Sequence, residues 1–451
     1  LLDWINSTRV READLDHLRA QKDHAGRRRF DEGFLSWLAE TGGFGSVSIR
    51  SVPEGRVVHG HEPISVVEGP LAVAQILETS FLNHLNYQTL VATKASRVAE
   101  AAAGGPVLEF GMRRGPDVGA NAGARAALIG GADASSNVGA STAMGVDPQG
   151  THAHSMVQLF MALGEGEIGA FRAYAATYPD ECLLLVDTID TLESGMPNAI
   201  TVFEELRADG HEPIGIRLDS GDLAHLAVRA AKMLDDAGFG DTRIVLSSEL
   251  DVLAMWQIRA QIVDEAPRYG IRADAVLHRL VYGVGTRLIT SHGYSALGGV
   301  YKLVAIDGSG EWIPAMKLSD TPEKMPIPGD KRVWRIYDDR GLATADVVSA
   351  GDEDLSFGGS LELYHPHRDG IARHLEGIRD VEELVVPVYD DGARTDPAPS
   401  LAEMRERRRL DLDRLDTGVR RLVNPHVYHV SLTQKVKQLQ GEMIARERQP
   451  R

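Results

Sequence analysis

The feature that most constrains this chain is a repeated order of strand, polar turn and helix between residues 107 and 284. Five short apolar runs occur there, at 107–110, 183–186, 214–218, 244–246 and 280–284. The polar residues after four of these runs are 32, 28 and 38 positions apart in the chain: Asp187, Asp219, Ser247 and Gly285. Each interval has room for a strand, a helix and two loops. The spacing therefore predicts a parallel α/β core, either a barrel or a doubly wound sheet.

The run at 214–218 shows how such a strand presents polar groups. Its apolar residues alternate with Arg217 and Asp219, which therefore share the opposite face of the strand. A helical apolar stripe at 223–237 can cover the apolar face. We expect Arg217 and Asp219 to point into the barrel at the carboxyl ends of its strands, where active sites of this architecture lie.

Changes in composition along the chain predict three domains. Helices and a small β module (45–70) occupy residues 1–105, and they are expected to pack with strands at 325–400. Residues 106–324 form the catalytic barrel, and 400–451 form a helical C-terminal extension. The expected fold class is α/β, with an irregular barrel-like core of parallel strands, a smaller flanking β-rich domain and a helical tail.

Charge and composition exclude several classes of protein. The net charge of −17 argues against a general nucleic-acid binder, because neutralising phosphates requires spread positive charge. No apolar run approaches the roughly 18 residues of a membrane-spanning helix. Cys182 is the single cysteine, which excludes a disulfide framework and fits a reducing cytoplasm. We expect no nucleic-acid or membrane partner and a cytoplasmic location.

Two polar clusters follow the first strands. The segment 109–117 places Phe110, Arg113 and Arg114 beside a strand end, and arginine forks suit carboxylate or phosphate groups; a surface ion-pair turn is the alternative. The second cluster contains His152 and His154 before an apolar helix. These histidines could ligate a metal, or one could act as a nucleophile toward a phosphoryl group, or they could be hydrogen-bonded core residues.

Two more clusters follow the later strands. Asp219 and Asp222 flank a Ser-Gly turn, Ser220-Gly221, and could bind a sugar diol, hold Mg²⁺ through waters or simply cap a helix. Serine and glycine turns at the last two strands could cradle a phosphate; they contain Ser247, Ser248, Gly283, Gly285, Thr286 and Arg287. Together the clusters predict an enzyme that binds a sugar phosphate or a similar anion.

These clusters belong to longer motifs, which occur in one order: EFGMRRGPD at 109–117, GTHAHS at 150–155, LLVDTIDT at 184–191, RLDSGDL at 217–223, GVGTRLIT at 283–290 and LGGVYKLV at 297–304. In order and spacing the chain resembles the nicotinate phosphoribosyltransferases nearly end to end. The resemblance implies that the ring nitrogen of nicotinate displaces pyrophosphate from 5-phosphoribosyl-1-pyrophosphate. It also implies Mg²⁺ on that pyrophosphate, ATP as a co-substrate, a homodimer with shared active sites, and a place in NAD salvage by the Preiss-Handler route.

The resemblance assigns roles to particular residues. His154 would be the phosphohistidine that couples ATP hydrolysis, and Phe110 would stack on the pyridine ring. Arg113 would meet the carboxylate of nicotinate, while Asp219, with Asp222 nearby, would hold the ribose hydroxyls. The remaining substrate-binding positions would be Arg114, Ser136, Thr151, Ser155, Asp187, Arg217, Ser220, Gly221, Ser247, Ser248, Gly283, Gly285, Thr286, Arg287 and Lys302.

Two departures from the family pattern and several rival functions remain. Family members begin with a further segment carrying a TDLY motif, which we expect to precede Leu1, and the turn after Arg114 is two residues shorter than usual. Ser136 lies where nicotinamide-using relatives have an acid, which favours a carboxylate substrate. The rivals are a nicotinamide or quinolinate transferase, a metal-dependent barrel hydrolase using His152 and His154, and a catalytically silent scaffold.

Overall fold

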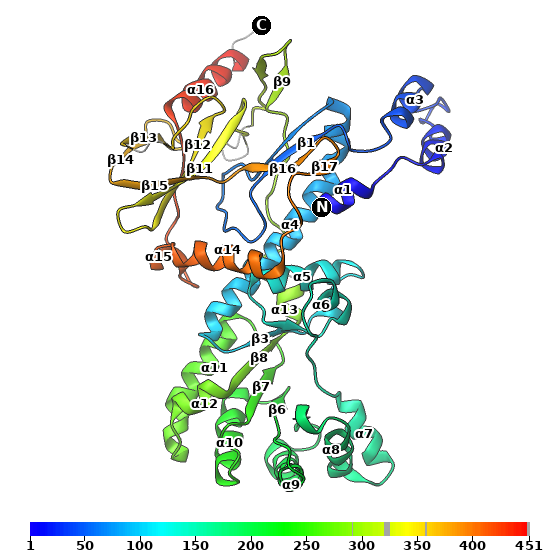
Figure 1. Ribbon diagram of the computed structural model, residues 1–451, viewed down its shortest axis with the longest axis vertical. Coiled ribbons are helices and arrows are strands. Elements are labelled where there is room, and N and C mark those ends of the chain that lie inside the picture. Colours follow the sequence, from blue (N-terminus) through cyan, green and yellow to red (C-terminus); the bar gives the residue numbers. More distant parts are fainter. Residues whose placement is uncertain (291, 320–324, 357–358, 449–451) are drawn as a thin grey trace. The chain divides into compact units, whose positions relative to one another are not determined.

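The computed structural model describes residues 1–290, 292–319, 325–356 and 359–448. The chain divides into two compact units (Figure 1). We call Tyr87–Leu297 the central unit, and Leu1–Asn86 together with Gly298–Arg451 the terminal unit. The helix α4, Leu71–Ala102, runs without a break through the first change of unit.

The central unit contains a six-stranded parallel sheet. In chain order its strands are β3 (Val107–Glu109), β4 (Ala134–Ser135), β5 (Leu183–Leu185), β6 (Gly215–Leu218), β7 (Arg243–Ser247) and β8 (Leu280–Val284). Their order across the sheet is β4-β3-β8-β7-β6-β5. This is the chain order around a ring, in which the last strand, β8, adjoins the first, β3. The ring is open between β4 and β5, so the expected irregular barrel-like α/β core is confirmed.

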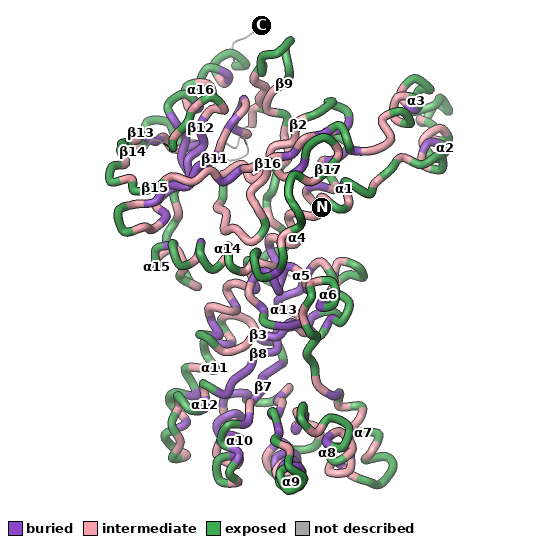
Figure 2. The backbone as a smooth tube through the Cα atoms, viewed as in Figure 1, coloured by how far each residue is buried: buried purple, intermediate pink, exposed green. Residues whose placement is uncertain are grey.

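Helices accompany these strands: α5 (Gly119–Gly130), α6 (Val138–Ala143), α7 (His154–Ala162), α8 (Gly166–Thr177), α9 (Met196–Ala208), α10 (Leu223–Asp236), α11 (Val252–Glu265), α12 (Ala273–Arg279) and α13 (Thr286–Ile289). The strands β3, β7 and β8 are buried along their length, whereas the helices are exposed on their outer faces (Figure 2). In α10, Ala224, Ala227, Val228 and Ala231 are buried at helical spacing, which explains why this segment forms a helix over the sheet.

The terminal unit contains three sheets. The first has the order β17-β16-β1-β2, the second is the hairpin β10-β9, and the third has the order β14-β13-β18-β12-β11-β15. Their bounds are β1 (Ser48–Ser51), β2 (Ser65–Glu68), β9 (Ala305–Asp307), β10 (Trp312–Pro314), β11 (Lys331–Asp338), β12 (Ala343–Ala350), β13 (Leu361–Tyr364), β14 (Ala372–Leu375), β15 (Ile378–Glu383), β16 (Val386–Asp390), β17 (Ala393–Arg394) and β18 (Val430–Leu432).

The helices of the terminal unit besides α4 are α1 (Leu2–Ser7), α2 (Glu12–Ala20), α3 (Glu32–Thr41), α14 (Leu401–Asp413), α15 (Thr417–Arg420) and α16 (Gln434–Arg448). The stretch 400–451, expected to be helical, also contains β18, which pairs in parallel with β12. The chain passes between units at Asn86/Tyr87 and Leu297/Gly298.

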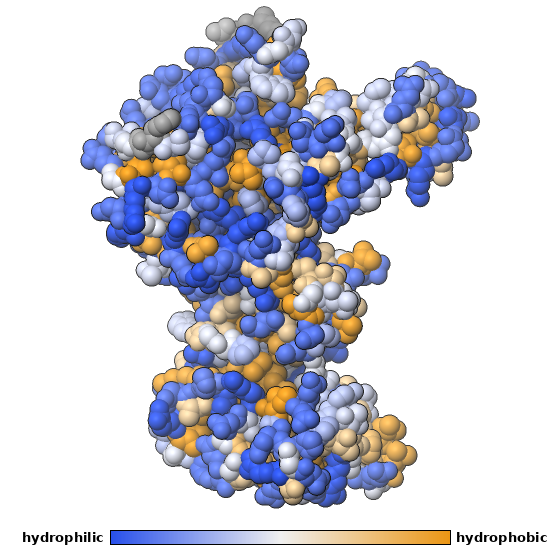
Figure 3. Space-filling view, in the orientation of Figure 1, coloured by the Kyte–Doolittle hydropathy of each residue, from blue (hydrophilic) through white to orange (hydrophobic). Residues whose placement is uncertain are grey.

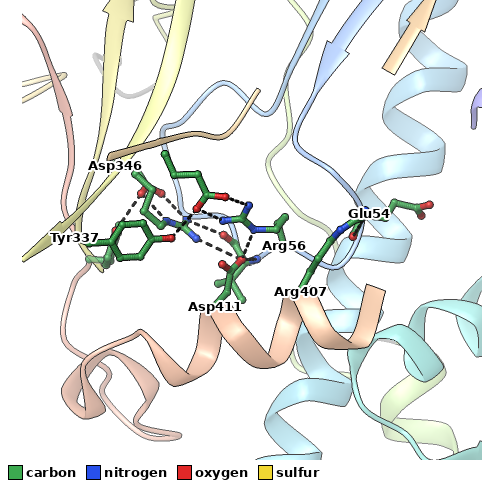
Figure 4. A network of polar contacts seen from close by, with 10 residues as sticks. Glu54, Arg56, Tyr337, Asp346, Arg407 and Asp411 are labelled. Carbon is green, nitrogen blue, oxygen red and sulfur yellow. Dashed lines mark hydrogen bonds and ion pairs between the residues drawn. The ribbon is translucent and has the colours of Figure 1, made fainter. Parts of the chain in front are cut away.

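A buried ionic network links distant parts of the terminal unit (Figure 4). Arg335 on β11 binds both oxygens of Asp346 on β12 at 2.8 and 2.7 Å, and these side chains are 1% and 0% exposed. Arg56 joins Glu382 on β15 to Asp411 on α14, with N···O distances of 2.6 and 2.9 Å. The loop after β1, the third sheet and α14 are therefore held together by paired charges.

The surface is mostly polar where Figure 3 shows it, and apolar side chains gather around α7, where Leu159 and, directly after the helix, Leu163 are exposed. No helix in the described part of the chain combines the length and the apolar character that crossing a bilayer requires.

Candidate active site

A connected polar network lies at the carboxyl ends of β5, β6 and β7. Arg217 on β6 donates from Nε to Ser247 Oγ at 2.8 Å and from Nη2 to Asp219 Oδ1 at 3.0 Å. Ser247 Oγ in turn donates to Asp219 Oδ1 at 2.6 Å. Parallel strands bring their carboxyl ends to one edge, and this is why residues 30 positions apart meet here.

Asp187, which follows β5, joins this network to His154. Asp187 Oδ1 is 3.0 Å from His154 Nε2, while Oδ2 accepts hydrogen bonds from Asp219 N at 2.9 Å and Ser220 Oγ at 2.6 Å. The side chain of Asp187 is 1% exposed, whereas that of His154 is 39% exposed. The carboxylate is therefore fixed from three sides, and the imidazole that it holds faces solvent.

A cleft of about 280 Å³ opens beside Asp187. Its lining includes Ser220 and Gly221 of the turn after β6, together with Asp190 and Thr191. Gly221 has a φ of +78°, a conformation that glycine adopts without strain. The Ser-Gly turn predicted to take part in binding thus borders an open space.

Phe110 and Thr151 extend the network to β3 and to the segment before α7. Arg217 Nη1 donates to Thr151 Oγ1 at 3.0 Å, and its guanidinium carbon lies 5.5 Å from the centroid of the Phe110 ring. Gly283 on β8 makes room for that ring, because a Cβ there would lie 2.6 Å from its edge. The GVG motif therefore seats the aromatic side chain that the sequence singled out.

The turn after β7 has an unusual backbone. Ser248 and Glu249 have φ values of +95° and +49°, which are costly for residues with side chains and cluster at functional sites. Gly285, the residue before α13, approaches Phe110, because a Cβ there would lie 3.0 Å from the Phe110 carbonyl oxygen. Thr286 begins α13, and Arg287 is held by Glu249 at 3.2 Å and Asp251 at 2.5 Å.

Other predicted residues lie near this region without a hydrogen bond or ion pair to the network. Arg113 and Arg114 lie in the single 3₁₀ turn Met112–Arg114 after β3 and are exposed, and among the described residues neither has an ion pair. Ser136, also exposed, donates its backbone N–H to Glu109 O at 3.0 Å. Ser155 is the second residue of α7 and is exposed.

Two predicted residues have other surroundings. Asp222 is the N-cap of α10 and accepts from His225 N at 3.1 Å and Gln261 Nε2 at 2.9 Å, so the capping alternative describes its geometry. Lys302 belongs to the terminal unit, where its ammonium donates to Tyr301 O at 2.7 Å and lies 3.7 Å from Glu78.

Glu109 is a buried residue of this region that the sequence analysis did not name as a site residue. It is 0% exposed, accepts from Ser135 Oγ at 2.6 Å and bonds the backbone N–H of Gly111. Burial raises the pKa of its carboxyl group. A charged residue inside a three-residue apolar strand was the only available signal.

The two histidines of the GTHAHS motif do different things. His152 is 9% exposed and its Nε2 accepts from Leu185 N at 3.0 Å, so it is not aimed at the same point as His154. Within the described ranges, no group of three His, Cys, Asp or Glu side chains could hold a metal ion. The metal-hydrolase interpretation therefore has no ligand set in this part of the chain.

Comparison with known proteins bears on the whole chain. The family model described as "Nicotinate phosphoribosyltransferase C-terminal domain" matches residues 330–440. The nicotinate phosphoribosyltransferase of Bacillus subtilis is 41% identical over 388 residues, which is 85% of this chain and 74% of the relative. The human nicotinate phosphoribosyltransferase is 33% identical over 88% of this chain and 80% of its own.

The fold agrees with these sequence matches. The crystal structure of human nicotinic acid phosphoribosyltransferase superposes with a TM-score of 0.80 at 29% identity, and the match covers 98% of this chain and 90% of that one. Five of the six motifs that carry the resemblance lie around the carboxyl ends of the central sheet, and the human protein shares this fold. The chain belongs to the nicotinate phosphoribosyltransferase family.

Proposed function

We propose that the protein transfers the phosphoribosyl group of 5-phosphoribosyl-1-pyrophosphate to nicotinate and couples this transfer to ATP hydrolysis through phosphorylation of His154. The observation that carries the proposal is the 3.0 Å contact between His154 Nε2 and the nearly buried Asp187. The products would be nicotinate mononucleotide and pyrophosphate, which places the reaction in NAD salvage by the Preiss-Handler route.

Asp187 supports the role of His154 as a nucleophile. A carboxylate beside Nε2 favours the tautomer with its proton on that atom, which leaves the lone pair of Nδ1 free. Nδ1 would attack the γ-phosphorus of ATP, an N–P bond would form, and ADP would leave as the β,γ-bridging P–O bond breaks. Asp187 would stabilise the resulting positive imidazole. Attack by water on phosphorus would later release phosphate and restore the neutral ring.

The transfer itself needs positioning rather than a general base, because the pyridine nitrogen already has its lone pair. Phe110 offers an aromatic face for the ring. Arg113 would bind the nicotinate carboxylate, and its guanidinium is exposed. Arg217 connects Phe110 to Asp219, which would hold the ribose hydroxyls, so one guanidinium sets the spacing between base and sugar.

The 5-phosphate would be bound by the turns after β7 and β8. Ser248 and Gly285 present backbone groups where the strands end, and Thr286 adds a hydroxyl group. The hydroxyl of Ser247 donates to Asp219, so Ser247 would have to exchange that partner before it could donate to the phosphate. Arg287 already has two carboxylate partners, so binding of phosphate to its guanidinium would require it to exchange one of them.

The fit of Mg²⁺ to the site depends on the substrate. Asp187 has both oxygens in hydrogen bonds and Asp219 Oδ1 accepts two, so these side chains do not form a cation cage. We propose that Mg²⁺ arrives on the pyrophosphate, where it would reduce the charge of the leaving group.

The remaining proposals concern the setting of the enzyme. The single cysteine, Cys182, is buried and unpaired with another cysteine, which agrees with a reducing cytoplasm. A homodimer with shared active sites rests on the family resemblance, and sedimentation equilibrium tests it.

The function is tested with one coupled assay. The protein is given 5-phosphoribosyl-1-pyrophosphate, Mg²⁺, ATP and nicotinate, nicotinamide or quinolinate, and pyrophosphate and ADP are followed together. We expect nicotinate-dependent release of both.

His154→Ala should abolish the coupled ADP release and leave a slower ATP-independent transfer. His211→Ala is the matched control, because His211 forms a similar pair with Asp180 at 2.7 Å in the same unit. Pyrophosphate release with nicotinamide or quinolinate but not with nicotinate would contradict the proposed substrate. Coupled ADP release by the His154 variant would contradict the proposed phosphohistidine.

A further inference from the structure

The open edge of the central sheet is where the segment carrying His154 lies. The sheet ends at β4 on one side and β5 on the other, and no ladder joins these two strands among the described residues. The chain between them contains α6, α7 and α8. A backbone N–H on an unpaired strand edge needs a hydrogen-bond partner if it is buried.

Two contacts tie this segment to the two free edges. Gln149 N donates to Ser135 O, the last residue of β4, at 3.0 Å. On the other side, Leu185 N, at the end of β5, donates to His152 Nε2 at 3.0 Å. The imidazole of His152 therefore stands where the carbonyl oxygen of a neighbouring strand would be.

The surroundings of His152 favour the neutral, accepting form of its ring. Its ring centroid lies 4.9 Å from that of Tyr174 and 6.2 Å from that of Phe171. Nδ1 faces Ala153 O at 3.5 Å, which suits a proton on that nitrogen and a lone pair on Nε2. Burial lowers the pKa of His152, which keeps the ring uncharged.

The contacts of the two histidines are in register. His152 meets Leu185, and His154, two residues later, meets Asp187, two residues after Leu185. We propose that His152 is a positioning residue, whose imidazole completes the edge of β5 at Leu185 and so sets the register in which His154 meets Asp187. This rests on the proposed function, since it concerns the formation of the phosphohistidine.

The test uses two variants, and only one of them can accept a hydrogen bond near the position of Nε2. His152→Phe keeps a ring among Tyr174 and Phe171 but has no acceptor, whereas His152→Gln can place an oxygen near the position of Nε2. The rate of phosphoenzyme formation from γ-labelled ATP, the ATP-independent transfer at saturating phosphoribosyl donor, and the hydrogen exchange of the Leu185 amide are measured for each.

We expect His152→Phe to slow phosphoenzyme formation by roughly 10–100-fold, the usual cost of losing a group that orients a reacting side chain. Its ATP-independent transfer should be unchanged, and its Leu185 amide should exchange faster than in the wild type. His152→Gln should recover most of the phosphorylation rate and the amide protection.

Three results would overturn the proposal: a normal phosphorylation rate in His152→Phe, no recovery in His152→Gln, or an equal loss of phosphorylation and ATP-independent transfer, which indicates a merely structural role. A failure of the proposed function looks different, because the wild-type protein itself would then carry no phosphate on His154. The positioning role would fall with it, and the exchange of Leu185 would still decide whether His152 completes the edge.

Discussion

Two polar networks in this protein use the same types of side chain, arginine and aspartate, but differ in how far these are exposed. In the terminal unit, Arg335 and Asp346 are 1% and 0% exposed, and both guanidinium and carboxylate are filled by protein partners (Figure 4). In the central unit, Arg217 and Asp219 form a pair through one contact of 3.0 Å, but they remain 18% and 25% exposed, and His154 is 39% exposed.

The difference follows from the cost of desolvation. Burying a charge is costly unless that charge is paired and hydrogen-bonded, so the charged atoms of Arg335 and Asp346 are taken up by protein partners. A site must keep some polar atoms for its substrate and therefore stays partly open to water. Both networks pair an arginine with an aspartate, and what separates them most clearly is the exposure of the paired side chains.

The largest expected effect is on activity in the central network. Asp187→Asn should reduce ATP-coupled turnover by about 10²–10⁴-fold, because a neutral amide cannot offset the positive charge on a phosphorylated imidazole. Steady-state release of ADP measures this. The control is Asp180→Asn, which neutralises the partner of His211 in the same unit. Equal turnover of the two variants would mean that Asp187 is no more than an ordinary partner of a histidine.

The next effect is on stability in the terminal network. Asp346→Ala should lower the free energy of unfolding by about 3–5 kcal/mol, because it removes the bidentate carboxylate of buried Arg335 and leaves that guanidinium only its longer ion pair with Asp411, at 3.4 Å. Urea denaturation measures the loss, and the activity of the folded fraction should be retained. Glu205→Ala removes the exposed pair with Arg172 and should cost less than about 1 kcal/mol. Comparable losses in the two variants would contradict the role of burial.

The cost of burying a charge in the terminal unit should also appear as a pH dependence of the free energy of unfolding, through Lys331. Burial lowers its pKa from 10.5 to about 8, and the ammonium donates to Gly329 O at 2.7 Å. Between pH 10.5 and 8 the unfolded chain takes up a proton that the folded chain does not, so stability falls as the pH is lowered. Below pH 8 both states carry the charge.

Lys331→Met removes this titration. The variant should be more stable than the wild type by up to about 3 kcal/mol at pH 7, and this advantage should vanish near pH 11. Unfolding free energies measured across that range check the prediction. A difference that stays constant with pH would mean that Lys331 titrates normally in the folded protein.

The smallest effect concerns the packing that shapes the site. Gly283→Ala puts a methyl group 2.6 Å from the Phe110 ring, which should cost about 1–3 kcal/mol and displace the ring. The KM for nicotinate should rise more than kcat falls. Gly139→Ala is the control, since its Cβ would meet only Asn137 Oδ1 at 3.7 Å. An unchanged KM in Gly283→Ala would mean that Phe110 does not touch the base.

Much of the central sheet could be predicted from local pattern. Each of the five apolar runs coincides with a strand to within one or two residues, and β4 was missed because two residues carry no detectable alternation. Asp187, Asp219 and Ser247 were predicted at strand ends and do meet there. The sequence left Asp222 between a ligand and a helix cap; Asp222 accepts from His225 N, which is the geometry of a cap, and it also contacts Gln261, 39 residues away, which no local pattern shows.

What the sequence determined by itself are the elements and the family, because strand alternation, helix periodicity and motif order are properties of neighbouring residues. The tertiary structure decided which charged side chains are paired within the protein and which stay exposed. It paired Arg56 with Glu382 across 326 positions and Arg287 with Asp251, and it turned His152 to an edge amide while leaving His154 open. Those outcomes depend on desolvation and on which distant atoms come within bonding distance, and neither quantity exists until the chain has folded.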